Sequence, residues 1–390
     1  MKNILLLGVL FFVGDAFAAQ TQFGRAIEDN FSDAPYLVYA ADAWSSVLGV
    51  NGVGGAVYSS LDGVYGDNVA DFRNLMAIIA YNDTALVQYQ TLMNVDVIEN
   101  VVKTPLVARR NRCVGNGRWC NLGQQTMNVN VGGVVKYSTV DKHKNNVDFK
   151  ARNTGARIDV SGYLNDGLQV GVVYLNAETN TRKTPVNIDA KTNGLMLYSK
   201  YLSQSGAFVN VGVNGGQINW AADKVIAGIQ NVSDYDTDYV AGMINMGVKA
   251  EYDSIFVVPQ FGVDYVRMMS EKHIDAAAQE FQKWWYNTLT GRFNLKMGLS
   301  WMADWFVVRP NINMGVGYDF ISHGSDAIGV RVLSGQSYLV PVNTPNRLSV
   351  IGGAGVGVYA EWLGIELDYE LDWRSDYVAH TGRLNLRLTF

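Results

Sequence analysis

The chain has 390 residues, of which 48% are of hydrophobic types and only 17% are charged, and its formal net charge is −5. Ordinary soluble domains carry roughly a quarter charged residues, so the composition argues against a cytosolic enzyme, and the acidic balance gives no basic footprint for a nucleic acid partner. No stretch after residue 20 offers the roughly eighteen uncharged apolar residues that a membrane-spanning helix needs, which excludes a helical membrane protein.

Residues 1–19 are predicted to be a secretory signal peptide. Lys2 gives a positive start, residues 4–13 form an apolar core, and residues 16–18 (Ala-Phe-Ala) form a cleavage site of small residues around one larger residue. The apolar core is too short for a membrane anchor. We therefore expect export of the chain and a mature N-terminus directly after this segment.

Residues 20–71 form a short N-terminal segment, and residues 72–126 hold a predicted linker helix and the segment before the first strand. Residues 82–84 (Asn-Asp-Thr) can cap a helix that runs over about 85–103 and stops before Pro105. About 19 helical residues reach roughly 28 Å, which is close to the thickness of a bilayer. The helix is therefore long enough to occupy a pore; a periplasmic or linker position is the alternative.

Cys113 and Cys120 are the two cysteines of the chain. In an exported protein they can oxidise, and they would close a short loop that contains Gly115 and Gly117. Two thiols without nearby histidines leave a tetrahedral zinc site half empty. We therefore predict a local disulfide, and we expect neither a metal nor a cofactor.

From residue 127 to residue 390, apolar residues recur at every second position in segments of about ten residues. In a closed sheet, lipid can cover the apolar face while the polar face lines an interior, and closure removes unpaired edges. We therefore predict an all-β chain that forms a transmembrane antiparallel β-barrel of about 12 strands. The predicted strands are about 127–138, 148–162, 167–177, 191–203, 206–217, 238–252, 254–267, 291–302, 304–319, 346–360, 362–373 and 377–390.

The predicted connections alternate in length, as in bacterial outer-membrane barrels with short periplasmic turns and longer external loops. This pattern places both ends of the barrel in the periplasm. One helix is predicted among the strands, at about residues 275–286. The longer loops are predicted near residues 143, 184, 227, 279 and 333.

The inward faces of the predicted strands carry charges of both signs, which could line a pore or pair with one another to fill a narrow interior. The predicted pore-lining residues are Arg157, Asp159, Lys249, Glu251, Lys296, Glu366, Asp368, Glu370, Asp372, Arg383 and Arg387. The last predicted strand has Leu386, Leu388 and Phe390 on its apolar face. Such an ending resembles the signal by which the outer-membrane assembly machinery recognises its clients.

Several motifs together resemble an autotransporter β-domain. They are a helix followed by an Arg-rich stretch (Arg109, Arg110 and Arg112), a Gly-Arg-Trp segment at 117–119, and the segments 154–159 and 165–171, which are similar to the family's second and third strands. The resemblance covers about residues 72–390. It implies a barrel that inserts into the bacterial outer membrane and exports an upstream passenger, with the linker helix left inside the pore.

Only about 50 residues lie between the predicted cleavage site and the helical region, whereas passengers of this family are commonly hundreds of residues long. We therefore expect a translocator with little or no passenger, which exports or displays a short N-terminal segment. The expected partners are outer-membrane lipid, the barrel assembly machinery and periplasmic chaperones, and the barrel is expected to be monomeric.

Two other functions stay open, a porin-like diffusion channel and a surface adhesin or structural barrel. An enzyme is not expected. The nearest catalytic candidate, His323-Gly324-Ser325-Asp326, falls in a predicted loop, where a flexible surface segment explains the same residue types.

Overall fold

The computed structural model describes residues 127–390, except for short gaps in the connections at 141–148, 166, 184–185, 227–228, 276–278, 304, 325–326, 333–336, 342–345 and 361. The predicted signal peptide, N-terminal segment, linker helix and cysteine pair lie outside the described residues. Among the described residues, no helix is long and apolar enough to cross a membrane.

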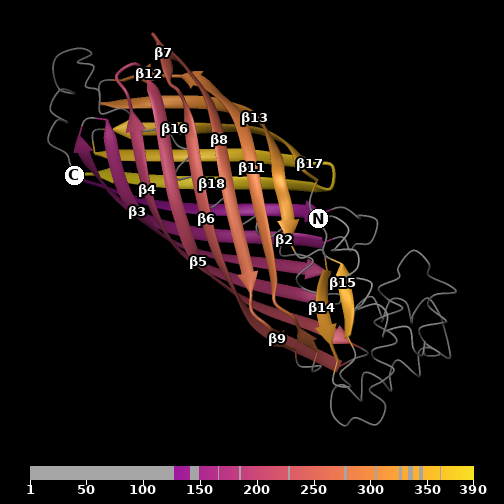
Figure 1. Cartoon of the computed structure of the whole chain (residues 1–390). Helices are drawn as coiled ribbons and strands as arrows, with labels where there is room; N and C mark the ends of the chain where they lie inside the picture. The colour runs from indigo at the N-terminus through magenta and orange to yellow at the C-terminus, as the bar shows by residue number, and fades with distance from the viewer. Residues whose placement is uncertain are drawn as a thin grey trace, which may run out of the picture.

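Twelve long antiparallel strands form a closed barrel in which each strand pairs with the next along the chain (Figure 1). The ring closes between the first and last strands, where Asn128 pairs with Thr389 and Val140 with Tyr377. Closure leaves no long strand with an unpaired edge, as a barrel in hydrocarbon requires. The strands are β1 (Met127–Val140), β2 (Phe149–Asn165), β3 (Leu168–Lys183), β4 (Val186–Leu202), β5 (Ala207–Ile226), β6 (Ile229–Val248), β8 (Ile255–Ser270), β11 (Trp284–Leu299), β13 (Phe306–Gly324), β16 (Leu348–Ala360), β17 (Leu363–Arg374) and β18 (Tyr377–Thr389).

Short turns gather at one end of the barrel, which corresponds to the periplasmic end of bacterial outer-membrane barrels. Two short strands, β7 (Ala250–Tyr252) and β12 (Trp301–Met302), extend the wall at this end (Figure 1). Gly206 has a φ of 90°, and a Cβ there would collide with the carbonyl oxygen of Lys249, so the turn requires glycine. Both barrel termini lie here, because the Phe390 amide donates to the Met127 carbonyl at 3.0 Å.

A second, four-stranded sheet lies among the connections at the opposite, extracellular end. It contains β9 (His273–Ile274), β10 (Glu280–Phe281), β14 (Ala327–Arg331) and β15 (Ser337–Pro341), in the order β15-β14-β10-β9. A stack of rings ties this sheet to the barrel, because His273 lies between Tyr235 and Phe281 with ring centroids 4.1 and 4.8 Å apart.

The predicted helix over residues 275–286 is wrong. Glu280 and Phe281 pair with β14 and β9, and β11 begins at Trp284. Local propensity favoured a helix there, and strand pairing with distant segments overrides it.

The long loops predicted near residues 184 and 227 are also wrong, because β3 runs to Lys183, β4 starts at Val186, β5 runs to Ile226 and β6 starts at Ile229. In these extensions the apolar residues occupy the inward face, where Ile188, Ala190 and Trp220 are buried, and the outward face is polar. The apolar alternation therefore changes face while backbone pairing continues, so the outward apolar pattern ends before the strands do.

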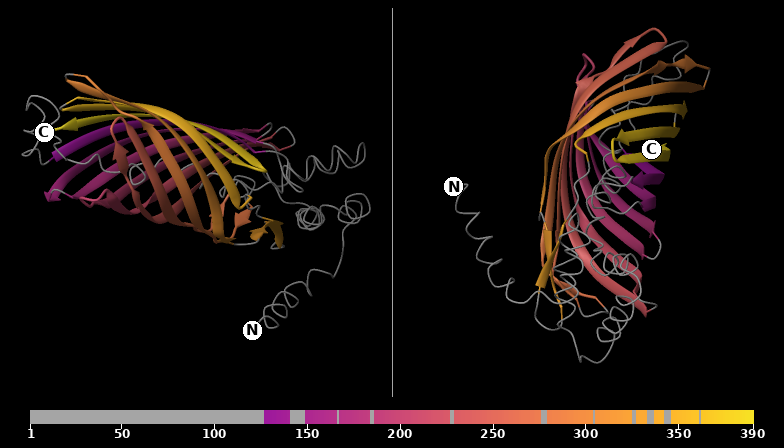
Figure 2. Two further views of the ribbon diagram at one scale, coloured as in Figure 1. Left: turned by 90° about the horizontal axis from the view of Figure 1, so that it is seen from above. Right: turned by 90° about the vertical axis from the view of Figure 1, so that its right-hand side faces the viewer.

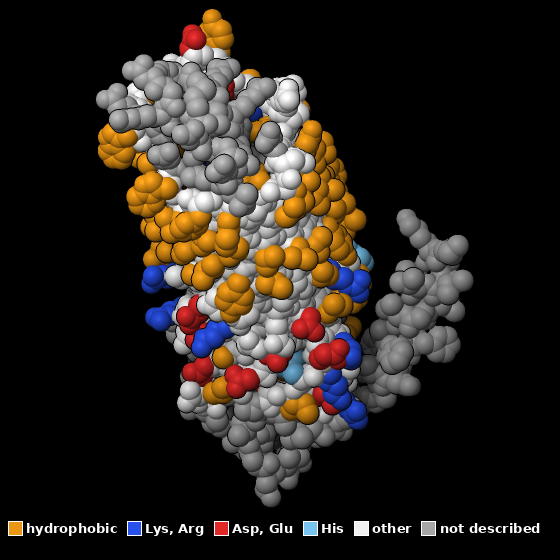
Figure 3. Space-filling view, turned by 90° about the vertical axis from the view of Figure 1, so that its left-hand side faces the viewer, with side chains coloured by type: hydrophobic (Ala, Val, Ile, Leu, Met, Phe, Trp, Pro, Cys, Tyr) orange, Lys and Arg blue, Asp and Glu red, His pale blue; other side chains and the backbone are white. Residues whose placement is uncertain are grey.

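The outer wall is apolar toward the turn end, and charged side chains gather toward the opposite end (Figure 3). On this wall Leu367 is 56% exposed and Trp373 is 51% exposed. Trp301, Trp305 and Trp362 are exposed at the turn end, where aromatic side chains commonly meet lipid headgroups. So many exposed apolar side chains would be a liability in water and suit a lipid surrounding. Two further views show that the barrel is elongated and that its strands are tilted (Figure 2).

Candidate functional site

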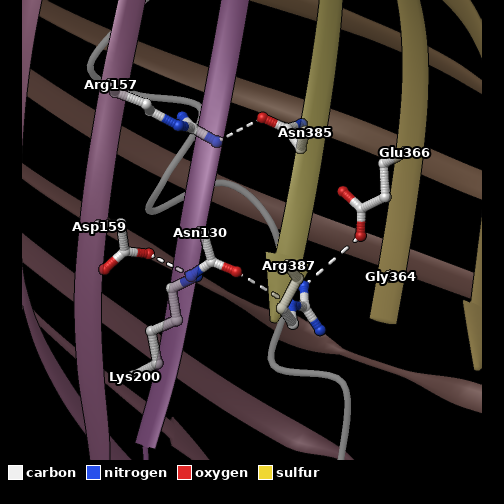
Figure 4. Close-up of a pocket in the computed structure, with 8 residues that line it drawn as sticks. All are labelled: Asn130, Arg157, Asp159, Lys200, Gly364, Glu366, Asn385 and Arg387. Atoms are coloured by element: carbon white, nitrogen blue, oxygen red, sulfur yellow. Dashed lines mark hydrogen bonds and ion pairs between the residues drawn. The ribbon is translucent and has the colours of Figure 1, made fainter. Parts of the chain in front are cut away.

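The inner wall near the turn end holds a polar cavity at the place where the barrel closes. Its residues come from β1, β2, β4, β17 and β18, so the first and last strands of the ring both contribute (Figure 4). The alternation of each strand turns these side chains inward while their neighbours face lipid. The lining residues are Asn130, Arg157, Asp159, Lys200, Gly364, Glu366, Asn385 and Arg387.

Hydrogen bonds connect this cavity across the closing seam between β1 and β18. The Asn130 amide donates to Asp159 Oδ2 at 2.6 Å, and Arg387 Nε donates to Asn130 Oδ1 at 3.3 Å. Arg387 also lies 3.5 Å from Glu366 Oε1, and Arg157 donates to Asn385 Oδ1 at 2.8 Å. These contacts join β2, β1, β18 and β17 from inside (Figure 4).

Two tyrosines donate hydrogen bonds to the two carboxylates of the same cavity. Tyr198 Oη donates to Asp159 at 2.9 Å, and Tyr359 Oη donates to Glu366 Oε1 at 2.7 Å. The Tyr198 ring lies over Gly171, where a Cβ would collide with it. Small residues opposite aromatic ones thus make room for polar groups on the inner wall.

Four of the predicted pore-lining residues, Arg157, Asp159, Glu366 and Arg387, therefore meet in one cavity. The sequence did not predict the other four cavity residues, Asn130, Lys200, Gly364 and Asn385. All but Gly364 have side chains on inward positions of predicted strands, but alternation alone does not show which inward residues meet.

The other predicted pore-lining residues lie in separate groups. Lys249 and Glu251 form an ion pair of 2.8 Å at the turn end, and Glu251 also lies 3.2 Å from Arg309. Lys296 lies 4.0 Å from Asp368, and Arg383 pairs with Glu370 at 3.0 Å. Asp372 continues the inward row of β17 and is half-buried.

Two deeply buried pairs were not predicted. Arg374 lies 2.7 Å from Asp319 and also donates to the Asn346 carbonyl at 2.6 Å. Thr290 donates to the other Asp319 oxygen at 2.7 Å. Nearby, Arg292 lies 3.3 Å from Asp264. Such pairs depend on which strands become neighbours, which residue spacing does not reveal.

The predicted assembly residues lie on the outer wall at the turn end. Leu386 is 40% exposed and pairs with Val131 and Ile365, and Phe390 is 64% exposed. Leu388 pairs with Val129 on one side and is partly covered. Their role as an assembly signal stays a prediction.

The described residues of the segment 323–326, the weak catalytic candidate, show no catalytic arrangement. His323 is exposed, and its ring meets the Trp285 ring edge-on at 5.3 Å. Ser325 and Asp326 lie outside the described residues. Within the part of the chain that the structure describes, no group of three or more His, Cys, Asp or Glu side chains is arranged to hold a metal.

Comparison with known proteins gives a family match and two curated relatives. The autotransporter β-domain family matches residues 129–370. Outer membrane protein A of Rickettsia conorii is 23% identical over 340 residues, which is 80% of this chain and 17% of that protein. Its counterpart in Rickettsia rickettsii is also 23% identical, over 80% of this chain and 15% of that protein. The chain therefore spans only about a sixth of the length of these relatives.

Solved structures show the same fold. The translocator domain of autotransporter NalP from Neisseria meningitidis aligns with a TM-score of 0.61 at 12% identity, over 79% of this chain and 99% of that one. The β-domain of the Bordetella autotransporter BrkA gives a TM-score of 0.53 at 15% identity, over 68% of this chain and 100% of that one. The transport unit of AIDA-I from Escherichia coli also gives 0.53, at 11% identity, over 80% of this chain and 100% of that one. The closed twelve-stranded ring and the match over most of its length show that this chain belongs to the autotransporter β-domain family and is a β-barrel of the bacterial outer membrane.

Proposed function

We propose that this barrel translocates the segment upstream of it, including residues 20–71, to the cell surface. The observation that carries the proposal is the position of Met127, which pairs with Gly162 and accepts a hydrogen bond from Phe390 at the turn end. A segment that joins β1 at the periplasmic end can reach the outside only through the lumen. The polar cavity at the seam and the ion pairs of the inner wall offer a hydrated chain polar partners on this path.

The linker helix predicted over residues 85–103 fits this path. After export it would occupy the lumen and join the surface segment to β1. A twelve-stranded barrel is wider than small barrels that side chains fill and narrower than porins of sixteen or more strands. One helix is therefore a suitable plug. Energy for export would come from barrel folding and assembly, and the family is one of transporter barrels, not of enzymes.

The test is a protease-sensitive epitope inserted near residue 50, with cleavage measured in intact and permeabilised cells. Export predicts cleavage in intact cells. A matched epitope in the connection between β1 and β2 should also be cleaved in intact cells. One in the turn between Leu202 and Ala207 should be cleaved only after permeabilisation. Protection of the residue-50 epitope, with both controls behaving as stated, would refute export.

A diffusion channel is the second candidate, because the inner wall carries charges of both signs at Lys249, Glu251, Lys296 and Asp368. Deleting residues 82–104 should raise single-channel conductance sharply if the helix occupies the lumen. A high conductance of the intact chain, unchanged by the deletion, would favour the channel. Low conductance in both proteins would favour an adhesin or structural barrel.

We further propose that Leu386, Leu388 and Phe390 are recognised by the barrel assembly machinery after periplasmic chaperones deliver the unfolded chain, and that the barrel is monomeric. Replacement of Phe390 by serine should then slow membrane insertion in cells while leaving folding into detergent micelles nearly unchanged. Equal insertion rates in cells would contradict this role.

A further inference from the structure

Three basic side chains lie together on the outer wall of β2 and β3, beyond the apolar part of that wall. Lys150, Arg152 and Arg182 are all exposed. Lys150 lies directly opposite Arg182 in the paired strands, and Arg152 is the next outward residue along β2. We call these three residues the basic triad. Residues directly opposite one another have Cβ atoms about 4.5–5.5 Å apart, so the triad concentrates three positive charges in a small area.

No carboxylate lies directly opposite a residue of the triad. The nearest acids are diagonal to it: Glu178 to Arg152 and Asp189 to Arg182. Like charges directly opposite in a sheet are destabilising. In the described part of the chain, no carboxylate forms an ion pair with any of the three side chains, and Arg152 instead lies over the Tyr137 ring, 5.6 Å from its centroid. The next cation along the wall, Lys191, differs because Glu178 lies directly opposite it. The three cations outnumber these two diagonal carboxylates, and on the β1 side the residues opposite the triad are Tyr137 and Thr139. Electrostatics therefore favours an external anion on this side of the triad.

The position of the triad restricts where that anion comes from. From Arg152 toward the turn end, the outward residues of β2 become Thr154, Ala156 and Ile158, and Ile158 is 52% exposed. The triad therefore borders the lipid-facing zone on its extracellular side. The side chains point away from the lumen, so a solute in the pore does not meet them. A molecule embedded in the surrounding membrane does.

The predominant charge of the outer wall changes sign between β2 and β6. Along the row of paired residues that contains Arg152, the outward residues become Asp189 on β4 and Asp234 on β6. Asp236 and Asp238 continue the acidic series on β6 and are exposed. The outward charge is therefore positive at the triad on β2 and β3 and mainly negative on β6, which suits a local lipid site better than a uniform charge at the membrane surface.

We propose that the basic triad binds the phosphate group of a phosphorylated glycolipid in the outer leaflet of the outer membrane. Arg152 and Arg182 can donate paired hydrogen bonds to phosphate oxygens, and Lys150 adds a point charge. The acyl chains would lie along the apolar residues of β1 and β2 below the triad, including Val131, Ile158 and Val160. This site does not depend on whether the barrel exports a segment.

The experiment measures lipid binding by native mass spectrometry on the full chain, refolded in a nonionic detergent. The probes are diphosphorylated lipid A, the same lipid with both phosphates removed, and inorganic phosphate. The test variant combines Lys150→Gln, Arg152→Gln and Arg182→Gln. The control is Arg267→Gln, because Arg267 is an exposed outward cation on β8. Folding of each protein is checked by its heat-dependent shift in electrophoretic mobility.

A basic residue near an anionic membrane surface contributes about a fivefold change in affinity. We therefore expect the triple variant to bind diphosphorylated lipid A roughly a hundredfold more weakly, Arg182→Gln alone about fivefold more weakly, and Arg267→Gln as well as the unmodified chain. The dephosphorylated lipid should bind weakly to all of them. Equal binding of both lipids, an undiminished affinity in the folded triple variant, an equal loss in the control, or an affinity for inorganic phosphate that matches the lipid would each overturn the proposal.

Discussion

The two walls of β17 have opposite chemistry although they come from one segment of 12 residues. On the outer wall, Leu367 is 56% exposed and meets lipid. On the inner wall, the adjacent Asp368 lies 4.0 Å from Lys296, and Glu370 pairs with Arg383. The comparison shows that a charged side chain has a different energetic cost on each wall. On the outer wall hydrocarbon makes a charge destabilising, whereas on the inner wall a charge is destabilising only where both water and a partner are missing.

The largest effect is expected where the inner wall is driest. Asp319→Ala removes the partner of Arg374, whose side chain is only 1% exposed, and also the acceptor of the Thr290 hydroxyl. Leaving one charge of a buried pair without its partner costs about 3–5 kcal/mol. Urea titration of the barrel refolded in lipid vesicles measures the loss in the free energy of unfolding. Asp319→Asn keeps an acceptor and should lose less; equal losses would show that charge is not the cause.

On the outer wall, a charge placed within the lipid-facing zone is the next most costly change. Leu367→Arg should destabilise the barrel by about 2–4 kcal/mol, the cost of an arginine near the bilayer midplane on the lipid side of a barrel. The matched change Asn219→Arg, on the outward face of β5 beyond the apolar zone, should cost about 0–1 kcal/mol. The same vesicle titration compares them. Similar costs would mean that the proposed depth of the membrane is wrong.

Packing on the inner wall gives a smaller effect. Gly171→Val displaces the Tyr198 ring that covers this glycine and weakens its hydrogen bond to Asp159. Overpacking of this kind typically costs about 1–3 kcal/mol. Gly242→Val is the control, because nothing lies within 4 Å of a Cβ built there. If both variants lost equal stability, strand propensity and not the ring contact would explain the result.

The sequence predicted the barrel well where lipid imposes a pattern. Alternation along segments such as residues 363–373 reflects two different solvents, so the fold class and the approximate strand count followed from it, and the twelve-stranded closed barrel confirms them. Beyond the membrane the apolar side chains turn to the inward face, as at Ile188 and Trp220, so the lipid-facing pattern does not reveal the extensions of β3 to β6. The strand at Glu280 and Phe281 depends on pairing with distant segments, which local propensity does not show.

The polar partners of the inner wall could not be predicted for a different reason. Arg374 and Asp319 are 55 residues apart, and Arg157 and Asn385 are 228 residues apart. Whether such residues meet depends on the order and stagger of strands around the closed ring, and local alternation does not reveal either. Charge on the inner face was predictable, but the pairs and the cavity at the seam were not.

The smallest effect is expected at Glu366 in the cavity at the seam. Its substitution tests whether the cavity is hydrated enough to tolerate the loss of a charge. Glu366 accepts the Tyr359 hydroxyl at 2.7 Å but lies 3.5 Å from Arg387, whose side chain is 29% exposed. In Glu366→Gln the amide oxygen still accepts from Tyr359, and Arg387 keeps its bond to Asn130, so the loss should stay below about 1 kcal/mol, as for a partly exposed ion pair. Glu366→Ala also removes the acceptor, which should raise the loss by about another 1 kcal/mol. A loss for Glu366→Gln as large as that for Asp319→Ala would show that the seam is as dry as the Arg374 site, and a lumen that dry would be a poor path for a hydrated chain.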